Sequence, residues 1–203
     1  MRTVRPVAAT TGNFKLGPGA GRVLLKTGRV GVAARAGHDL TIEVTNWSAV
    51  IEVPAEDAGG ITAATISADL DLGSLQVREG TGGVKPLTDR DRREIAVTAR
   101  KVLGADQHPE AVFVSDSFRP AADGGGGEIG GALTLRGQSR PLRLEVKQTG
   151  TDRYHAETQV IQSDYGIKPY TAFLGALRVR DAIDVTVEVD LSDPAAGSGT
   201  GHD

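Results

Sequence analysis

Apolar and polar residues alternate strictly on both sides of a short polar turn at residues 136–138. This period of two is typical of antiparallel strands with one buried face and one solvated face. Because the turn contains Gly137, the two strands are predicted to form a hairpin. Some other part of the fold must cover its apolar face, which consists of Ile129, Gly131, Leu133, Leu135, Leu142, Leu144 and Val146.

The same alternation predicts strands along most of the chain. Short strands are expected over 22–27, 29–36, 40–45 and 50–53, with Trp47 at a turn, so that this part forms a meander. Further strands are expected over 61–72, 111–118, 153–163 and 183–191, and the last of these alternates most cleanly. We estimate about eight or nine strands, and such an all-β domain closes into a barrel or forms a two-layer sandwich.

The period changes once, over residues 88–103, where a helix is predicted. Thr88 and Asp91 have the spacing of an N-terminal cap, and Gly104 ends the pattern. From Lys85 to Lys101 there are six Lys or Arg against three Asp or Glu. We interpret this basic face as solvated, with a weak dock for anionic lipid head groups as the alternative. The apolar stripe consists of Ile95, Ala99, Val102 and Leu103.

Composition limits the classes of function. The chain has 203 residues, which suits one large β domain, and only 4% of them are aromatic. Proteins that bind nucleic acids usually carry an excess of basic residues, whereas this chain has a net charge of -3. A nucleic-acid partner is therefore not expected. There is no cysteine, so disulfides and thiolate chemistry are excluded. The ends, residues 1–20 and 192–203, are rich in Gly, Pro and small residues and are predicted to be flexible.

Hydrophobic segments give an expectation about location. The first 13 residues contain no run of seven apolar residues, and nowhere do 18 apolar residues follow one another. We therefore expect a soluble cytoplasmic protein without stable membrane insertion. A mature form already trimmed of a secretory signal would look the same and would be periplasmic or secreted.

Small side chains on the predicted inward faces leave room for a ligand. An eight-stranded up-and-down barrel has an interior that is either filled or able to hold one small ligand. Here the inward positions are rich in Ala, Val and Leu and poor in Phe and Trp. The pattern alone does not decide between Phe113 and its neighbours for the inward face. The expected lining includes Ile66, Leu70, Phe113, Leu133, Leu135 and Leu144.

The chain contains four blocks of residues in a distinctive order: Asp106, His108, Pro109, Ala111, Val112, Phe113 and Ser115; then Gly130 to Gly137; then Pro141, Leu142, Leu144 and Val146; and finally Ser163, Asp164, Tyr165, Gly166 and Ile167. In their order and spacing, these blocks resemble the YceI-like family. The resemblance extends from about Gly21 to Leu191. A further element, Gly37-His38-Asp39-Leu40, is similar to that of a variant group of the family.

The resemblance implies an all-β, lipocalin-like barrel domain over residues 21–191, with one inserted helix. It implies a non-catalytic carrier that holds a long-chain isoprenoid or similar lipid inside the barrel, without cofactor or metal. No nucleic-acid partner is expected, and a homodimer is left open. The candidate ligand-binding residues are His38, Trp47, Ile66, Leu70, Phe113, Leu133, Leu135, Leu144, Tyr165, Ile167 and Phe173.

Two other functions stay open at this stage. One is a stress-related protein-interaction module with a filled barrel and a working surface on the basic helix. The other is a hydrolase or metal enzyme at His38, which stands beside Asp39. A general base or metal site needs further converging groups, and the other histidines are far away in the sequence. We therefore interpret His38 as bonding to the backbone at its bend, or else as touching the polar end of a ligand.

Several large apolar residues lie in the predicted loop from Tyr165 to Leu174, although surface loops are normally polar. The loop from Tyr165 to Leu174 forms either a lid over the barrel mouth or an ordinary loop packed on the barrel end. Trp47, the sole Trp, is either a core plug or a platform for the ligand.

Overall fold

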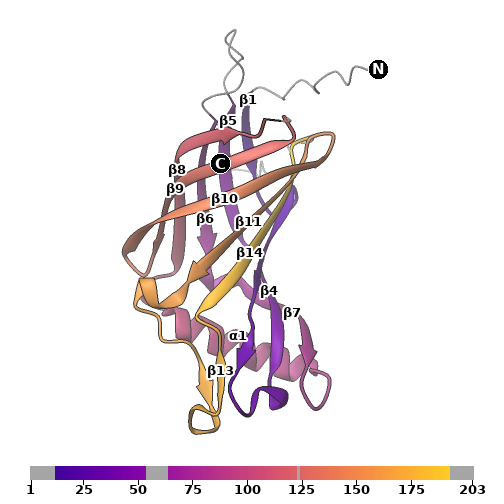
Figure 1. Cartoon of the computed structure of the whole chain (residues 1–203), viewed down its shortest axis with the longest axis vertical. Coiled ribbons are helices and arrows are strands. Elements are labelled where there is room, and N and C mark those ends of the chain that lie inside the picture. Colours follow the sequence, from indigo (N-terminus) through magenta and orange to yellow (C-terminus); the bar gives the residue numbers. More distant parts are fainter. Residues whose placement is uncertain (1–11, 54–63, 123, 193–203) are drawn as a thin grey trace, which may run out of the picture.

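The computed structural model describes residues 12–53, 64–122 and 124–192, which form a curled antiparallel sheet with one α-helix (Figure 1). The strands are β1 (Gly12–Leu16), β2 (Gly21–Lys26), β3 (Arg29–Val30), β4 (His38–Val44), β5 (Trp47–Val53), β6 (Thr65–Asp71), β7 (Leu75–Gly82), β8 (Glu110–Pro120), β9 (Gly126–Leu135), β10 (Gln138–Gly150), β11 (Arg153–Ile161), β12 (Thr171–Ala172), β13 (Leu177–Val179) and β14 (Ala182–Asp190). The helix is α1 (Asp89–Leu103), and the short 3-10 turns are η1 (Ala34–Ala36), η2 (Leu72–Ser74), η3 (Gln162–Tyr165) and η4 (Phe173–Gly175).

The eleven strands of the main sheet form eight runs that close into a barrel. Hydrogen-bonded neighbours follow the order β1-β5-β6-β8-β9-β10-β11-β14-β2-β4-β7. Leu16 pairs with Ala49 and Val23 with Val44, so β1 and β2 lie in turn along β5 and β4 as one bent run. The β6–β7 run lies along β5 and β4 in the same way. Because the β1–β2 run also pairs with β14, the sheet closes on itself. The predicted all-β barrel of about eight strands is confirmed, with three runs broken in two.

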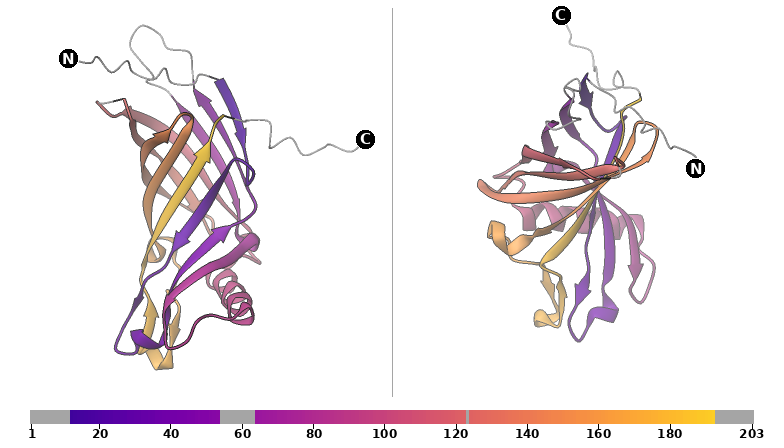
Figure 2. Two further views of the ribbon diagram at one scale, coloured as in Figure 1. Left: turned by 90° about the vertical axis from the view of Figure 1, so that its right-hand side faces the viewer. Right: turned by 45° about the horizontal axis from the view of Figure 1, so that its top comes forward.

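The lower end of the barrel is opened and covered by other elements. β8 pairs with β6 but not with β7, and α1, which connects β7 to β8, packs against β7. A small sheet of order β12-β13-β3 lies below the barrel (Figure 1). Figure 2 shows this sheet, α1 and the turn at η1 together at the lower end.

The predicted helix is confirmed, and its first turn is capped as its sequence suggests. The Thr88 hydroxyl accepts a hydrogen bond from the Asp91 amide, and the Asp91 carboxylate accepts one from the Thr88 amide at 2.9 Å. Gly104 adopts the left-handed conformation, at φ 69°, that ends a helix. The apolar stripe therefore has a fixed direction, and it faces the barrel.

The predicted hairpin is β9–β10, and its turn uses two left-handed residues. Arg136 and Gly137 have φ values of 52° and 72°, as a two-residue type I′ turn requires. Leu135 pairs with Gln138, and the register continues to Gly126 opposite Lys147. The residues at 129, 131, 133 and 135 are buried, so the predicted apolar face points into the barrel.

Several local predictions in the first part of the chain were wrong. Residues 12–16, which we assigned to a flexible segment, form β1 with Phe14 and Leu16 buried. The run at 29–36 is only the two-residue β3 followed by η1. Trp47 begins β5 rather than lying at a turn, and residues 50–53 do not return along β4, because β5 pairs with β1 and β6.

Other differences concern strands that alternation did not reveal. We did not predict β7, β12 or β13, because Gly-containing or very short segments carry little period-two signal. The predicted strand over 61–72 begins at Thr65 in the structure, and residues 61–63 lie outside the described part. The same holds for residues 1–11 and 193–203, which contain most of the two predicted flexible ends.

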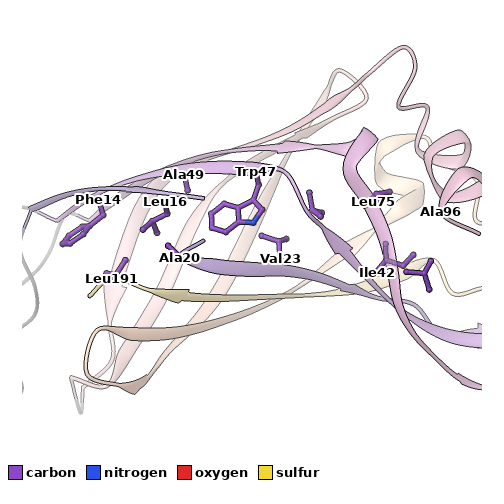
Figure 3. Packing of buried hydrophobic residues seen from close by; sticks show 12 residues of the cluster. Phe14, Leu16, Ala20, Val23, Ile42, Trp47, Ala49, Leu75, Ala96 and Leu191 are labelled. Carbon is purple, nitrogen blue, oxygen red and sulfur yellow. The ribbon is translucent and has the colours of Figure 1, made fainter. Parts of the chain in front are cut away.

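Buried side chains follow the inside of the barrel from end to end. Figure 3 shows the Trp47 ring lying among Leu16, Ala20 and Val23, which belong to or adjoin the β1–β2 run. A second buried cluster around Phe113, Ile129 and Leu133 lines the β8–β9 side. The two clusters coat the wall but leave space between them.

Candidate ligand-binding tunnel

The upper part of the barrel encloses an apolar compartment of about 530 Å³. Alternate residues of nearly every run of the barrel point into it, because successive side chains of a strand face opposite sides of the sheet. Its lining in the described part of the chain contains no Asp, Glu, Lys, Arg or His. The polar groups at its wall belong to Trp47, Gln148, Tyr154, Thr158 and Gln162. Such a surface suits a hydrocarbon and offers nothing to an ion.

Most of the predicted ligand-binding residues lie on this wall. Phe113 points inward at 6% exposure, while its neighbour Val114 is 51% exposed, so the strand face is settled. Trp47 is buried and also lines the compartment, so its position fits both roles considered for it, a core plug and a platform for the ligand. The predicted residues on the wall are Trp47, Ile66, Leu70, Phe113, Leu133, Leu135, Leu144 and Ile167.

A second compartment of about 650 Å³ lies at the lower end, between α1, the β2–β4–β7 part of the sheet and β13. The apolar stripe of α1 forms one side of it, through Ile95, Ala99, Val102 and Leu103. Its rim is polar and includes Arg29, His38, Lys85 and Arg178. The compartment is therefore amphipathic, with an apolar interior and a charged mouth.

The two compartments meet at a narrow waist. Four residues line both of them: Leu25, Leu103, Gln162 and Ile183. The two cavities therefore lie directly next to each other along the barrel, and we call the pair the tunnel. Each compartment falls within the range of about 300–1,000 Å³ that is usual for small-molecule sites.

Gln162 is the polar group at the waist, and its amide has one possible orientation. Its Nε2 donates to the carbonyl oxygens of Arg180 at 2.8 Å and Asp181 at 3.4 Å. Since a carbonyl oxygen only accepts, nitrogen must occupy this side and Oε1 the other. Gln162 is 6% exposed, and Oε1 has no hydrogen-bond partner among the described residues. This oxygen can accept a hydrogen bond from a ligand hydroxyl; periodicity could not reveal it.

His38 lies at the rim of the lower compartment, where its ring is held by the backbone. Its Nε2 is 2.8 Å from the carbonyl oxygen of Lys85. The neighbouring Asp39 turns elsewhere and accepts a hydrogen bond from the Arg29 amide at 2.8 Å. The side chains of His38 and Asp39 therefore form hydrogen bonds with different partners. In the described part of the chain, no group of three or more His, Cys, Asp or Glu side chains could hold a metal ion.

A model of one protein family matches most of this chain. The family model of the YceI-like domain matches residues 23–191, which includes all strands of the barrel except β1 and the first two residues of β2. The chain belongs to the YceI-like family.

Solved structures of three bacterial proteins are similar to this chain at low sequence identity. BcnA of Burkholderia cenocepacia matches with a TM-score of 0.53 and 15% identity, over 83% of this chain and 94% of that chain. A polyisoprenoid binding domain from Saccharophagus degradans, implicated in plant cell wall breakdown, has a TM-score of 0.49 and 12% identity, over 89% and 99% of the two chains. The Campylobacter jejuni YCEI protein has a TM-score of 0.48 and 18% identity, over 73% and 82%. The comparison with curated proteins gives no match.

The Ser163-to-Ile167 turn of this YceI-like chain supports the waist. Tyr165 and Ile167 are buried, at 3% and 1% exposure, and Ile167 lines the upper compartment whereas Tyr165 packs behind it. Arg136, in the hairpin turn, donates from Nη1 to the Gly166 carbonyl at 2.9 Å. Ser163 donates from its amide to the Asp181 carboxylate at 2.8 Å. The turn thereby fixes Gln162 between β11 and β14.

The predicted lid divides into an inner part and an outer part. Tyr170 lines the lower compartment, together with Leu177 and Val179 of β13. Phe173 lines neither compartment and is 64% exposed, and Leu174 is fully exposed. The segment therefore flanks the lower mouth, with its tip in solvent.

The phenol on the wall of the upper compartment, that of Tyr154, stays neutral. Burial raises the pKa of the Tyr154 phenol, and the charge of Asp152 adds to that effect. Burial likewise raises the pKa of Tyr165, behind the wall.

None of the helices in the described part of the chain is long and apolar enough to span a bilayer.

Proposed function

We propose that this YceI-like protein is a non-catalytic carrier that holds one long isoprenoid or similar lipid chain in the tunnel. The observation that supports this most strongly is the uncharged upper compartment, which adjoins the second compartment at the waist. The resemblance to a polyisoprenoid-binding family points in the same direction. A filled barrel, which the interaction-module alternative requires, does not agree with these cavities.

The energetics favour a ligand with several isoprene units. Burying one methylene-sized group contributes ~0.8 kcal/mol, so one five-carbon unit contributes about 4 kcal/mol. Association costs about 4–15 kcal/mol in lost freedom. A single unit therefore hardly binds, whereas several units in one tunnel bind tightly.

Trp47 gives a direct readout of ligand entry, because it is the sole Trp and lines the upper compartment. We expect a saturable change in its emission when the delipidated protein is titrated with a long-chain polyprenol. Ala68→Phe, which fills the compartment, should weaken binding about tenfold or more, or ~1.4 kcal/mol. Organic extraction of natively purified protein followed by mass spectrometry should show a co-purifying chain lipid.

Val114→Phe is the matched control, since Val114 lies on the neighbouring strand and points outward. It adds the same kind of ring to the outer wall and should leave binding unchanged. The proposal fails if no chain lipid changes the emission, or if Ala68→Phe binds as tightly as Val114→Phe.

A further inference from the structure

Exposed apolar side chains gather around the lower mouth. Among the described residues, the four most exposed large apolar side chains are Leu174, Val32, Val84 and Phe173. Leu174 is fully exposed, Val32 is 96% exposed and Val84 is 80% exposed. They occupy three loops at one end of the molecule, rather than being spread over the barrel wall (Figure 2).

Hydrogen bonds join these three loops into one surface. The Ala33 amide donates to the Ala176 carbonyl at 2.9 Å, which ties the loop of Val32 to the loop of Leu174. Arg29 donates from Nη1 to the Thr81 carbonyl at 3.1 Å, beside the loop of Val84. We call this surface the lower tip; it consists of residues 31–37, 82–87 and 170–179.

The conformation of the lower tip is unfavourable for a surface that meets only water. Phe173 and Leu174 have φ values of 50° and 56°, a region that bulky residues rarely adopt. The left-handed backbone at these two positions presents both side chains to solvent instead of packing them. Strained backbone at an exposed position is characteristic of functional segments.

The lower tip is also positively charged and continuous with the tunnel. Its three segments contain Arg35, Lys85 and Arg178 and no Asp or Glu, while two acidic residues of α1, Asp91 and Glu94, line the adjoining compartment. Val84 and Tyr170 line the lower compartment, so the exposed apolar side chains border its mouth. Exposed apolar side chains beside cations match an anionic bilayer surface, which takes up apolar groups and attracts basic ones.

We propose that the lower tip docks onto an anionic lipid bilayer, with Phe173 and Leu174 inserted among the lipids. The tunnel mouth then faces the membrane, and a lipid chain passes between bilayer and barrel without crossing water. The passage rests on the proposed carrier function, whereas the docking itself does not.

Vesicle co-sedimentation of the full chain tests the docking. The probe is a phosphatidylcholine vesicle with or without phosphatidylglycerol, at low and high salt. We expect binding to the anionic vesicles that falls with salt. The double variant Phe173→Ser/Leu174→Ser should lower the bound fraction about fivefold or more, because two inserted apolar side chains are lost.

Val114→Ser is the matched control, because it removes an exposed apolar side chain from the barrel wall; it should bind vesicles like the parent protein. Polyprenol uptake from detergent micelles, read by Trp47 emission, should be unchanged in the double variant. If the parent protein took up no polyprenol, that result would count against the carrier function but not against the docking.

Three results would overturn the docking proposal: absence of vesicle binding by the parent protein, equal binding to neutral and anionic vesicles, or equal binding by the double variant. A dimer in sedimentation velocity that the double variant abolishes, without vesicle binding, would instead assign the lower tip to a contact between copies.

Discussion

Individual residues in this protein set the chemistry of a wall that is otherwise uniform. Gln162 is the clearest case, because its neighbours in the tunnel are aliphatic and its free oxygen can accept a hydrogen bond. The carbonyl groups of Arg180 and Asp181 fix its amide, so this acceptor keeps one direction. A ligand with a hydroxyl at that depth would be favoured over a pure hydrocarbon of the same length.

Leu174 is expected to lower the stability of the free protein. A left-handed backbone costs a bulky residue about 1–2 kcal/mol, and Asn tolerates that conformation better. Leu174→Asn should therefore raise the free energy of unfolding by roughly 0.5–1 kcal/mol. Urea denaturation measures this change, with Val114→Asn as a control on the barrel wall.

An unchanged or lower stability of Leu174→Asn would show that the left-handed residue carries no strain. If the lower tip docks as proposed, the same variant gains stability and loses vesicle binding together. Such opposite effects are expected where a protein keeps an unfavourable residue for function.

Among the elements, α1 has two tasks, since it covers the opened end of the barrel and forms part of the lower compartment. Three of the five Lys or Arg residues of α1 bond within the molecule. Arg90 pairs with Glu94 at 2.8 Å, Arg92 donates to the Arg78 carbonyl at 3.0 Å, and Arg100 donates to the Gly73 carbonyl at 3.1 Å. These contacts favour the lower tip over the helix as the surface that meets lipid.

Thr88→Ala tests how far the cap holds α1 in place. Loss of an N-terminal cap costs about 1 kcal/mol, within a range of roughly 0.5–2 kcal/mol. We expect the free energy of unfolding, measured by urea denaturation, to fall by that amount. Thr98→Ala is the control, because Thr98 lies in the same helix beyond its first turn.

Titration by NMR gives a second readout of the cap. The side-chain hydrogen bond from Thr88, followed by its backbone amide, holds the pKa of Asp91 below its usual 3.8. A lowered pKa contributes stability above the usual value and loses it as the pH falls through the lowered value. In Thr88→Ala the pKa of Asp91 should move upward; an unmoved pKa would mean that the hydroxyl does not stabilise the carboxylate.

At the scale of the whole molecule, the bends in three runs of the barrel produce two compartments instead of one. The upper halves of these runs close the barrel around the upper compartment. The lower halves diverge, and α1 and β13 enclose the second chamber. The waist between the chambers is therefore the place where ligand length can be sensed.

Ile183→Phe should shorten the longest chain that the tunnel accepts, because Ile183 lines both compartments at the waist. In the parent protein, the affinity should rise with the number of isoprene units in the polyprenol, by up to about 4 kcal/mol per unit before the entropic cost of binding is subtracted. It should level off when the tunnel is full. In Ile183→Phe it should level off at fewer units. Trp47 emission measures the series, and Val114→Phe serves as the control. Identical length profiles would mean that a bound chain does not pass the waist.

The sequence by itself determined the elements whose pattern is local. Alternation at 129–135 and 183–191 fixed which faces point inward, and the cap at Thr88 fixed where the helix begins, because these signals depend on a few neighbouring residues. The family resemblance added the barrel and suggested the kind of ligand that we propose. Phe113 could not be assigned to a face by pattern, since Val112 and Val114 are apolar as well.

Only the tertiary structure decided features that depend on distant partners. Gly12–Leu16 becomes a strand because β5 pairs with it, and Trp47 enters the wall because β4 and β5 form one bent run. The waist joins Leu25, Leu103, Gln162 and Ile183 from four separate elements. The lower tip joins three loops in the same way. Closure of a sheet brings such residues together through long-range hydrogen bonds, and no local period in the sequence records which strands will meet.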